Sequence, residues 1–262
     1  MMAFYLLGCA AAGAAGGWAV DAWIRRVATG EARRLGPVGA AATPRTAAAS
    51  QAVAAPQAVP AGTPPAPLDR HLAGGRGRRC VVPALSALGC LLVGIRFGPA
   101  PAAVPFLYLA PLLASLAVVD LHTHRLPDAL TLPSYPIGLL LIGGTALARG
   151  EPSALLSALV AAALLSGVFL VLALLRPAGM GMGDVKAVGV IGLFVGSLGV
   201  GAALVAAFVG SLLALVAGAV LVATGRSARR APTPFGPWLA LGALTPVLAG
   251  PALVTAALQA VS

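Results

Sequence analysis

Charged residues are scarce in this sequence, and acids are the scarcest of them. Only 9% of its 262 residues are charged, seven are acidic, and 5% are aromatic. A soluble domain usually carries about 25% charged residues, so this chain has too little polar surface to fold as a water-soluble globule. Hydrophobic residues make up 59% of it and the mean hydropathy is +0.96, which indicates a polytopic membrane protein.

Cysteines and several common catalytic motifs are also scarce or absent. The three cysteines, Cys9, Cys80 and Cys90, are too few and too scattered for a disulfide framework or a zinc site. The glycine-rich segment near residue 181 lacks the G-K-[ST] of a phosphate loop, and no G-x-S-x-G elbow is present. We therefore expect neither a metal ion nor another cofactor.

Apolar runs bounded by Arg, Pro and Gly predict an all-α transmembrane bundle of about eight spans. The run 185–223 is divided into two spans, because one span needs only ~20 residues and glycines near residue 199 mark a hairpin. The predicted spans are 4–23, 81–98, 101–119, 133–148, 153–175, 185–200, 201–223 and 237–260.

The basic residues predict the orientation of these spans. When residues 25–79 are placed in the cytoplasm, every Lys and Arg except Arg96 and Arg149 falls on the cytoplasmic side, in agreement with the positive-inside rule. Basic loops at an anionic inner leaflet account for the net charge of +10, so we expect contacts with the lipid bilayer and no nucleic-acid partner. The first apolar run has its positive charges after it, unlike a secretory signal, and we expect it to be retained.

The chain divides into three predicted regions. Residues 1–24 form the first span and residues 80–262 form the membrane core. Between them, residues 25–79 are rich in Ala, Pro and Arg and contain few large apolar residues that could build a core. We expect this region to be a disordered cytoplasmic loop.

Asp120 and Asp184 are the candidate catalytic residues. In the predicted topology Asp120 ends the span 101–119 and Asp184 begins the span 185–200, both at the cytoplasmic boundary. The helix dipole disfavours a carboxylate at the first position and favours one at the second, where an N-cap role is an alternative. Two converging carboxylates can share a proton and activate water; two independent boundary carboxylates are the alternative that the pattern also allows.

Residues around these aspartates are candidates for substrate binding or loop support. Gly181 and Gly183 precede Asp184, where glycine widens the choice of backbone conformation and leaves room for a substrate strand. Lys186 could bias the charge of the pair or hold the loop. Asp128 precedes the fourth span, and we expect it to cap that helix.

Three segments, in this order, resemble the motifs of bacterial prepilin peptidases. Residues 120–133 (DLHTHRLPDALTLP) resemble the first aspartate motif, residues 181–184 (GMGD) resemble the GxGD motif, and residues 234–237 (PFGP) resemble a segment that precedes the last helix. The resemblance covers roughly residues 81–260. It implies an aspartyl protease that removes the short basic leader of type IV prepilins or pseudopilins at the cytoplasmic face, with Asp120 and Asp184 as the catalytic pair.

The amino-terminal region departs from that family. Longer members carry paired CxxC motifs after the first span, and many also methylate the new amino terminus of the product. Residues 25–79 contain no CxxC, so we expect no zinc and no methyl transfer.

Two other functions compete with this interpretation. A presenilin-like or signal-peptide-peptidase-like protease also uses a GxGD motif. The other two motifs of that family are YD and PAL, whereas this chain has VD and PFGP at the corresponding places. A small transporter or a secretion assembly factor could bind a proton or a cation at the same aspartates. The depth of the aspartates in the membrane distinguishes a transporter from a boundary protease. Transport sites tend to lie near the membrane midplane, whereas both aspartates are predicted at the inner boundary.

Overall fold

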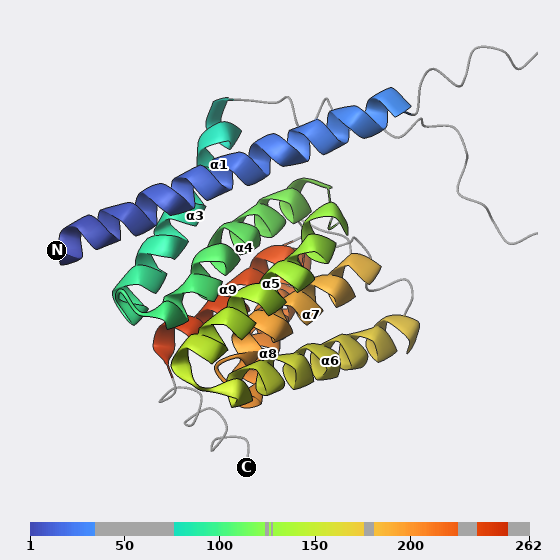
Figure 1. Ribbon diagram of the computed structural model, residues 1–262. Coiled ribbons are helices and arrows are strands. Elements are labelled where there is room, and N and C mark those ends of the chain that lie inside the picture. Colours follow the sequence, from blue (N-terminus) through green and yellow to red (C-terminus); the bar gives the residue numbers. More distant parts are fainter. Residues whose placement is uncertain (35–75, 124–125, 127, 176–180, 225–234, 251–262) are drawn as a thin grey trace, which may run out of the picture.

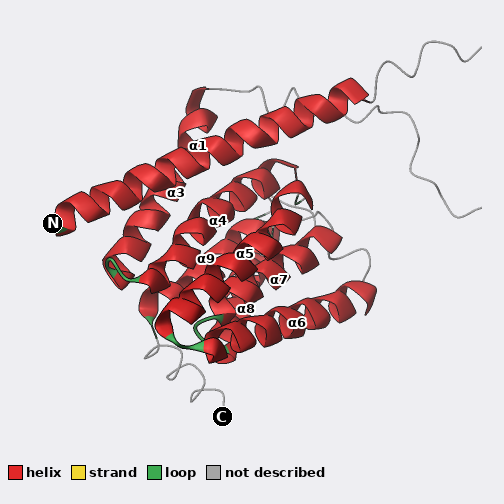
Figure 2. Cartoon of the chain, viewed as in Figure 1, coloured by secondary structure: helices red, strands yellow, loops and turns green. Residues whose placement is uncertain are grey.

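The computed structural model describes residues 1–34, 76–123, 126, 128–175, 181–224 and 235–250, which form a bundle of helices (Figures 1 and 2). No strand occurs within these ranges, and the all-α prediction is confirmed. The helices are α1 Met2–Arg34, α3 Arg76–Phe97, α4 Val104–Thr123, α5 Asp128–Arg149, α6 Pro152–Leu175, α7 Met182–Gly196, α8 Val200–Ala223 and α9 Gly236–Ala249, with a 3-10 turn η1 at Pro101–Ala103.

A helix lies on each of the eight predicted spans, but the helices differ in length. Five segments are long and apolar enough to cross a membrane: one each in α1, α5, α6 and α8, and one that joins η1 to α4. The apolar parts of α3 and α9 are shorter. Helix α7 has 15 residues and is about 22 Å long, against about 30 Å for a hydrocarbon core. The chain is a multi-pass membrane protein.

The predicted disordered loop is helical at both of its ends. Helix α1 continues to Arg34 and α3 begins at Arg76, so disorder across all of residues 25–79 is wrong for these two margins. Residues 27–34 (VATGEARR) contain no proline and several good helix formers, and they extend the helix beyond its apolar part. The remainder of the loop, 35–75, and the end of the last predicted span, 251–260, lie outside the described residues.

Helix α7 is the centre of the bundle. Val185 and all residues from Ala187 to Gly196 are buried, and α7 packs against α4, α5, α6, α8 and α9. Helix α1 lies at the edge, against α3 and α4 (Figure 1). Because consecutive helices alternate in direction, the end of α4 and the starts of α7 and α9 lie at the same end of the bundle.

Helix α6 shows how the bundle meets lipid. Its buried face consists mostly of small residues, including Ala158, Ala161 and Ala162. Its outer face exposes large apolar side chains such as Leu156 and Val168. Exposing these side chains to water would cost about 25 cal/mol per Å², whereas acyl chains solvate them freely. Small residues inside and large ones outside are typical of helices that pack closely in a membrane.

The contact between α6 and α7 is a backbone-to-backbone contact. A Cβ atom on Gly192 would lie 2.9 Å from the carbonyl oxygen of Ala161 and 3.0 Å from Cα of Ala162. One turn later, a Cβ on Gly196 would lie 2.5 Å from Cβ of Ala161. The G-x-x-x-G spacing therefore allows the two helices to approach closely, which compensates for the weak hydrophobic driving force within lipid.

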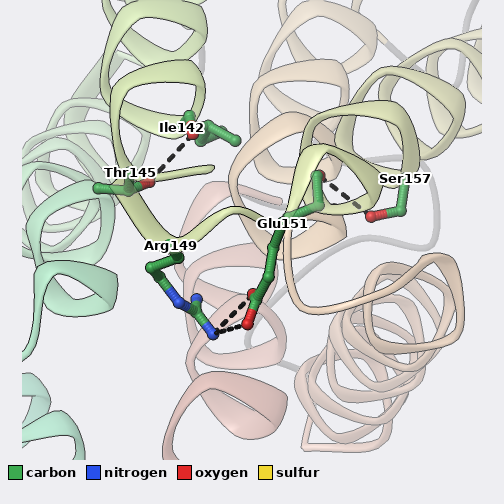
Figure 3. Close-up of polar contacts among 6 residues, drawn as sticks. Ile142, Thr145, Arg149, Glu151 and Ser157 are labelled. Carbon is green, nitrogen blue, oxygen red and sulfur yellow. Dashed lines mark hydrogen bonds and ion pairs between the residues drawn. The ribbon is translucent and has the colours of Figure 1, made fainter. Parts of the chain in front are cut away.

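The turn between α5 and α6 satisfies its own polar groups (Figure 3). Gly150 adopts φ +66°, and the Glu151 N–H donates to the carbonyl of Ala146 at 2.9 Å, which closes the end of α5. The Arg149 guanidinium pairs with the Glu151 carboxylate, with Nη2 and Oε2 2.7 Å apart. This neutral turn lies at the end of the bundle opposite Asp120.

A second cation lies at that same end, at the terminus of α9. Helix α9 ends at Ala249, and the residue that caps it is Gly250, which has φ +76°. The Arg96 guanidinium of α3 lies directly against Gly250 and 5.3 Å from the centre of the Phe97 ring. A cation at the carboxyl end of a helix is favourable because it compensates the negative end of the helix dipole.

We predict that Gly192→Ala destabilises the protein by about 1–3 kcal/mol, because the added methyl group overpacks against backbone atoms of α6 that can yield only if the helix moves. The measurement is the free energy of unfolding in detergent micelles. Gly143→Ala in α5 is the matched control, because a Cβ there would meet nothing within 4 Å, and we expect it to be neutral or slightly stabilising. Equal stability of the two variants would contradict the close α6–α7 contact.

Candidate active site

Asp120 and Asp184 lie at one end of the bundle, on adjacent helix termini. Asp120 is in the last turn of α4 and only 3% exposed, and Asp184 is in the first turn of α7 and half-buried. The two carboxylates are close enough for the charge of one to act on the other. The structure thus brings together the two acids that the sequence placed at one boundary.

Asp184 is fixed by the start of its own helix. Gly181 is the N-cap residue, with extended backbone angles, and its N–H donates to Oδ2 of Asp184 at 3.3 Å. In return, the Asp184 N–H donates to the carbonyl of Gly181 at 3.0 Å. Asp184 is therefore not the N-cap residue itself; it occupies the third helical position, and its carboxylate makes the one half of a capping box that is possible here, because Gly181 has no side chain to make the other. This arrangement leaves Oδ1 of Asp184 outside the cap.

Asp120 is held by a different helix. Its Oδ2 atom accepts a hydrogen bond of 2.6 Å from the N–H of Gly236, the first residue of α9. A buried carboxylate at the carboxyl end of α4 is disfavoured by the dipole of that helix, but the amino terminus of α9 provides a compensating positive end. The contact explains how an acid is tolerated in a buried position that the sequence marks as unfavourable.

The environment of Asp184 favours its protonated form. Burial of the side chain, followed by the negative charge of Asp120, raises the pKa of Asp184 from 3.8 to about 6. The hydrogen bond from the Gly181 amide acts in the opposite direction. Two interacting carboxylates titrate as a pair, and the raised value means that this pair holds one proton at a higher pH than two separate aspartates would.

Lys186 links α7 to α5 through both its side chain and its backbone. Its Nζ atom lies 2.7 Å from Oδ1 of Asp128, in the first turn of α5. Its carbonyl oxygen accepts a hydrogen bond of 3.0 Å from the hydroxyl of Tyr135. Of the two roles left open for Lys186, this geometry favours holding the loop, and Asp128 is its ion-pair partner.

The two glycines before Asp184 occupy different surroundings. Gly181 is exposed. A Cβ on Gly183 would lie 3.0 Å from Cβ of Leu126 and 3.1 Å from its carbonyl oxygen. The space left by the missing side chain of Gly183 is thus filled by the chain itself, which makes Gly183 a packing residue instead of the opening for a substrate strand that we expected.

Sequence reasoning missed Tyr135. A tyrosine in an apolar span signals a hydroxyl that needs a hydrogen-bond partner, and Tyr135 lies on the same helix face as Asp128, two turns further on. The sequence does not reveal that the partner is a carbonyl of α7. Among the residues with described surroundings, no three His, Cys, Asp or Glu side chains gather as a metal site would require.

Residues 107–222, which contain both aspartates, match the model of the type IV leader peptidase family. The resemblance predicted from the three motifs is confirmed over this segment. It leaves out Gly236 and the rest of α9.

Curated relatives extend the similarity beyond that segment. The prepilin leader peptidase/N-methyltransferase of Bacillus subtilis (strain 168) is 34% identical over 163 residues, which cover 62% of this chain and 62% of the relative. The protein of the same name from Burkholderia pseudomallei (strain K96243) is 35% identical over 184 residues, covering 64% and 56%. The chain thus spans less than two thirds of the length of these relatives. No solved structure matches it significantly.

We predict that Tyr135→Phe loosens the first turn of α7, because it removes one of the two links from Lys186 to α5. Loss of a hydrogen bond worth about 1 kcal/mol corresponds to roughly five-fold faster amide exchange in that turn. Hydrogen exchange detected by mass spectrometry on a peptide covering residues 182–188 measures the effect. Tyr108→Phe is the control, since it deletes a hydroxyl bonded at 3.0 Å to Ser134, away from this turn; equal exchange in both variants would argue against the link.

Proposed function

We propose that this chain is a membrane-embedded aspartyl endopeptidase that removes the leader of type IV prepilins or pseudopilins at the cytoplasmic face of the inner membrane. The observation that carries the proposal is the pair of interacting carboxylates, Asp120 and Asp184, within the segment that matches the type IV leader peptidase family. The names of the curated relatives, which are prepilin leader peptidases, support the choice of substrate.

The proposed mechanism assigns different tasks to the two acids. Asp184, with its raised pKa, holds the proton and acts as the acid, and Asp120, held through Oδ2 by the Gly236 amide, acts as the base. Asp120 takes a proton from a water molecule while the water oxygen attacks the scissile carbonyl, and Asp184 donates its proton to the carbonyl oxygen. Collapse of the tetrahedral intermediate breaks the C–N bond: the proton that Asp120 took from water passes to the departing amine nitrogen, and a hydroxyl proton of the intermediate returns to Asp184, which restores the pair.

The distribution of basic residues supports the cytoplasmic placement. The segments that join α4 to α5, α6 to α7 and α8 to α9 carry Arg125, Arg176, Arg226, Arg229 and Arg230. These segments follow the helix termini at the Asp120 end of the bundle. The opposite end has Arg96 and the Arg149–Glu151 pair. The positive-inside rule then orients both aspartates toward the cytoplasm.

The proposal is restricted to peptide cleavage. The relatives' names also include N-methyltransferase, but residues 25–79 of this sequence contain no CxxC. We therefore propose a peptidase without methyl transfer and without a zinc ion.

We predict that Asp120→Asn and Asp184→Asn each reduce leader cleavage on the order of 10³-fold or more, because neither amide can act as the base or the acid. Cleavage of a prepilin from the same genome in isolated membranes, followed by product mass, measures this. Glu151→Gln makes the same change of charge at the far end of the bundle and should cleave normally. Normal cleavage by either Asn variant would refute the pair, and no cleavage by the wild type would turn attention to proton or cation binding at these aspartates.

We also predict that cleavage declines as the pH rises through about 6. Asp184 has a raised pKa, so its proton is present below that value and is lost above it. At pH values above this pKa, kcat/KM should therefore fall up to tenfold per pH unit. Initial rates between pH 5 and pH 8, with a return to pH 6 to exclude inactivation, provide the measurement. A rate that increases steadily over this range would contradict the assignment of Asp184 as the acid.

A further inference from the structure

We propose that Gly236 is a positioning residue for Asp120: its N–H fixes one carboxylate oxygen, and its missing side chain creates the space that Asp120 occupies. The catalytic consequence of this inference rests on the proposed peptidase function, whereas the contact itself does not. Gly236 lies outside the segment that matches the family model, which ends at residue 222.

The first support is the hydrogen bond. The Gly236 nitrogen lies 2.6 Å from Oδ2 of Asp120 in a buried environment. Gly236 is the first residue of α9, and the first N–H groups of a helix have no partner within it. Asp120 supplies that partner, and a charged acceptor makes such a bond shorter and stronger than a neutral one.

The second support is steric. A Cβ atom on Gly236 would lie 2.9 Å from Cβ, 3.0 Å from Oδ2 and 3.2 Å from Cγ of Asp120. Gly236 is not among the described glycines with positive φ, so its backbone angles alone do not require glycine. The contact with Asp120 therefore accounts for the glycine at this position.

The third support is that α9 has little freedom to move away. A Cβ on Gly242 would lie 2.5 Å from the backbone nitrogen of Gly210 in α8 and would also meet the carbonyl of Ala206. Helices α8 and α9 are thus in close backbone contact one and a half turns beyond Gly236. A side chain at position 236 would displace Asp120 more readily than it would displace α9.

The arrangement gives the two oxygens of Asp120 separate tasks. Oδ2 is occupied by the Gly236 amide, which sets the rotation of the carboxylate. The other oxygen is then left for the base that the proposed mechanism needs. A displacement of about 1 Å in such a group can reduce a rate roughly 100-fold.

Gly236→Ala tests this inference through steady-state kinetics in membranes. We expect kcat to fall roughly 100-fold with KM nearly unchanged, because α9 and the substrate contacts stay in place while the base moves. Gly144→Ala, at a position where a Cβ meets nothing within 4 Å, should retain kcat. Thermal unfolding in micelles checks that Gly236→Ala is folded; an unchanged kcat in a folded Gly236→Ala protein would overturn the inference.

A second measurement does not depend on activity. In ¹⁵N-glycine-labelled protein, the Gly236 amide is assigned as the resonance that Gly236→Ala removes, and its hydrogen exchange is compared between wild type and Asp120→Ala. We expect exchange to be at least about tenfold faster in Asp120→Ala, because the amide has then lost its acceptor. Equal exchange would overturn the contact. If the wild type cleaves no prepilin, the proposed function fails and the exchange result alone decides whether Gly236 holds Asp120.

Discussion

A buried carboxylate at the carboxyl end of an apolar helix is the constraint on which the architecture of this protein depends. Asp120 loses hydration there and also meets the unfavourable end of the α4 dipole. The amino terminus of α9 compensates both effects through the Gly236 amide. That helix can reach Asp120 only because Gly210 and Gly242 allow α8 and α9 to touch through their backbones. The position of one carboxylate is therefore linked to packing about one and a half turns further along α9.

The second acid is supported in another way. Asp184 belongs to the first turn of the central helix, where the N–H of Gly181 donates to one of its carboxylate oxygens. Helix α7 is in turn fixed along its length by the glycine contacts with α6. At its start it is fixed by Lys186, whose backbone carbonyl and side chain contact Tyr135 and Asp128 of α5. One acid is thus placed by a neighbouring helix terminus and the other by its own helix. The candidate site lies where the end of α4 and the starts of α7 and α9 come together.

The sequence predicts the elements well because its signals are local. Long apolar runs, basic loops and the two aspartates at span boundaries require no knowledge of partners, and the helices appear at the predicted positions. Contacts between segments that are distant in the sequence are harder to predict from it. The partner of Tyr135 and the packing of Gly183 against Leu126 depend on how α5 and α7 approach each other, which no single segment encodes. The helical margins of the predicted loop were missed because helix formation there follows from residues 27–34 after the apolar run ends.

Helix α9 carries opposite charges against its two ends: the carboxylate of Asp120 at Gly236 and the guanidinium of Arg96 at Gly250. Each charge is opposite in sign to the end of the helix dipole that it faces, and each contact is therefore favourable. A shift of α9 along its axis by one turn, about 5.4 Å, would separate both pairs at once, since the helix is a rigid rod. The axial register of α9 is therefore restrained by electrostatics at its two ends as well as by its close backbone contact with α8.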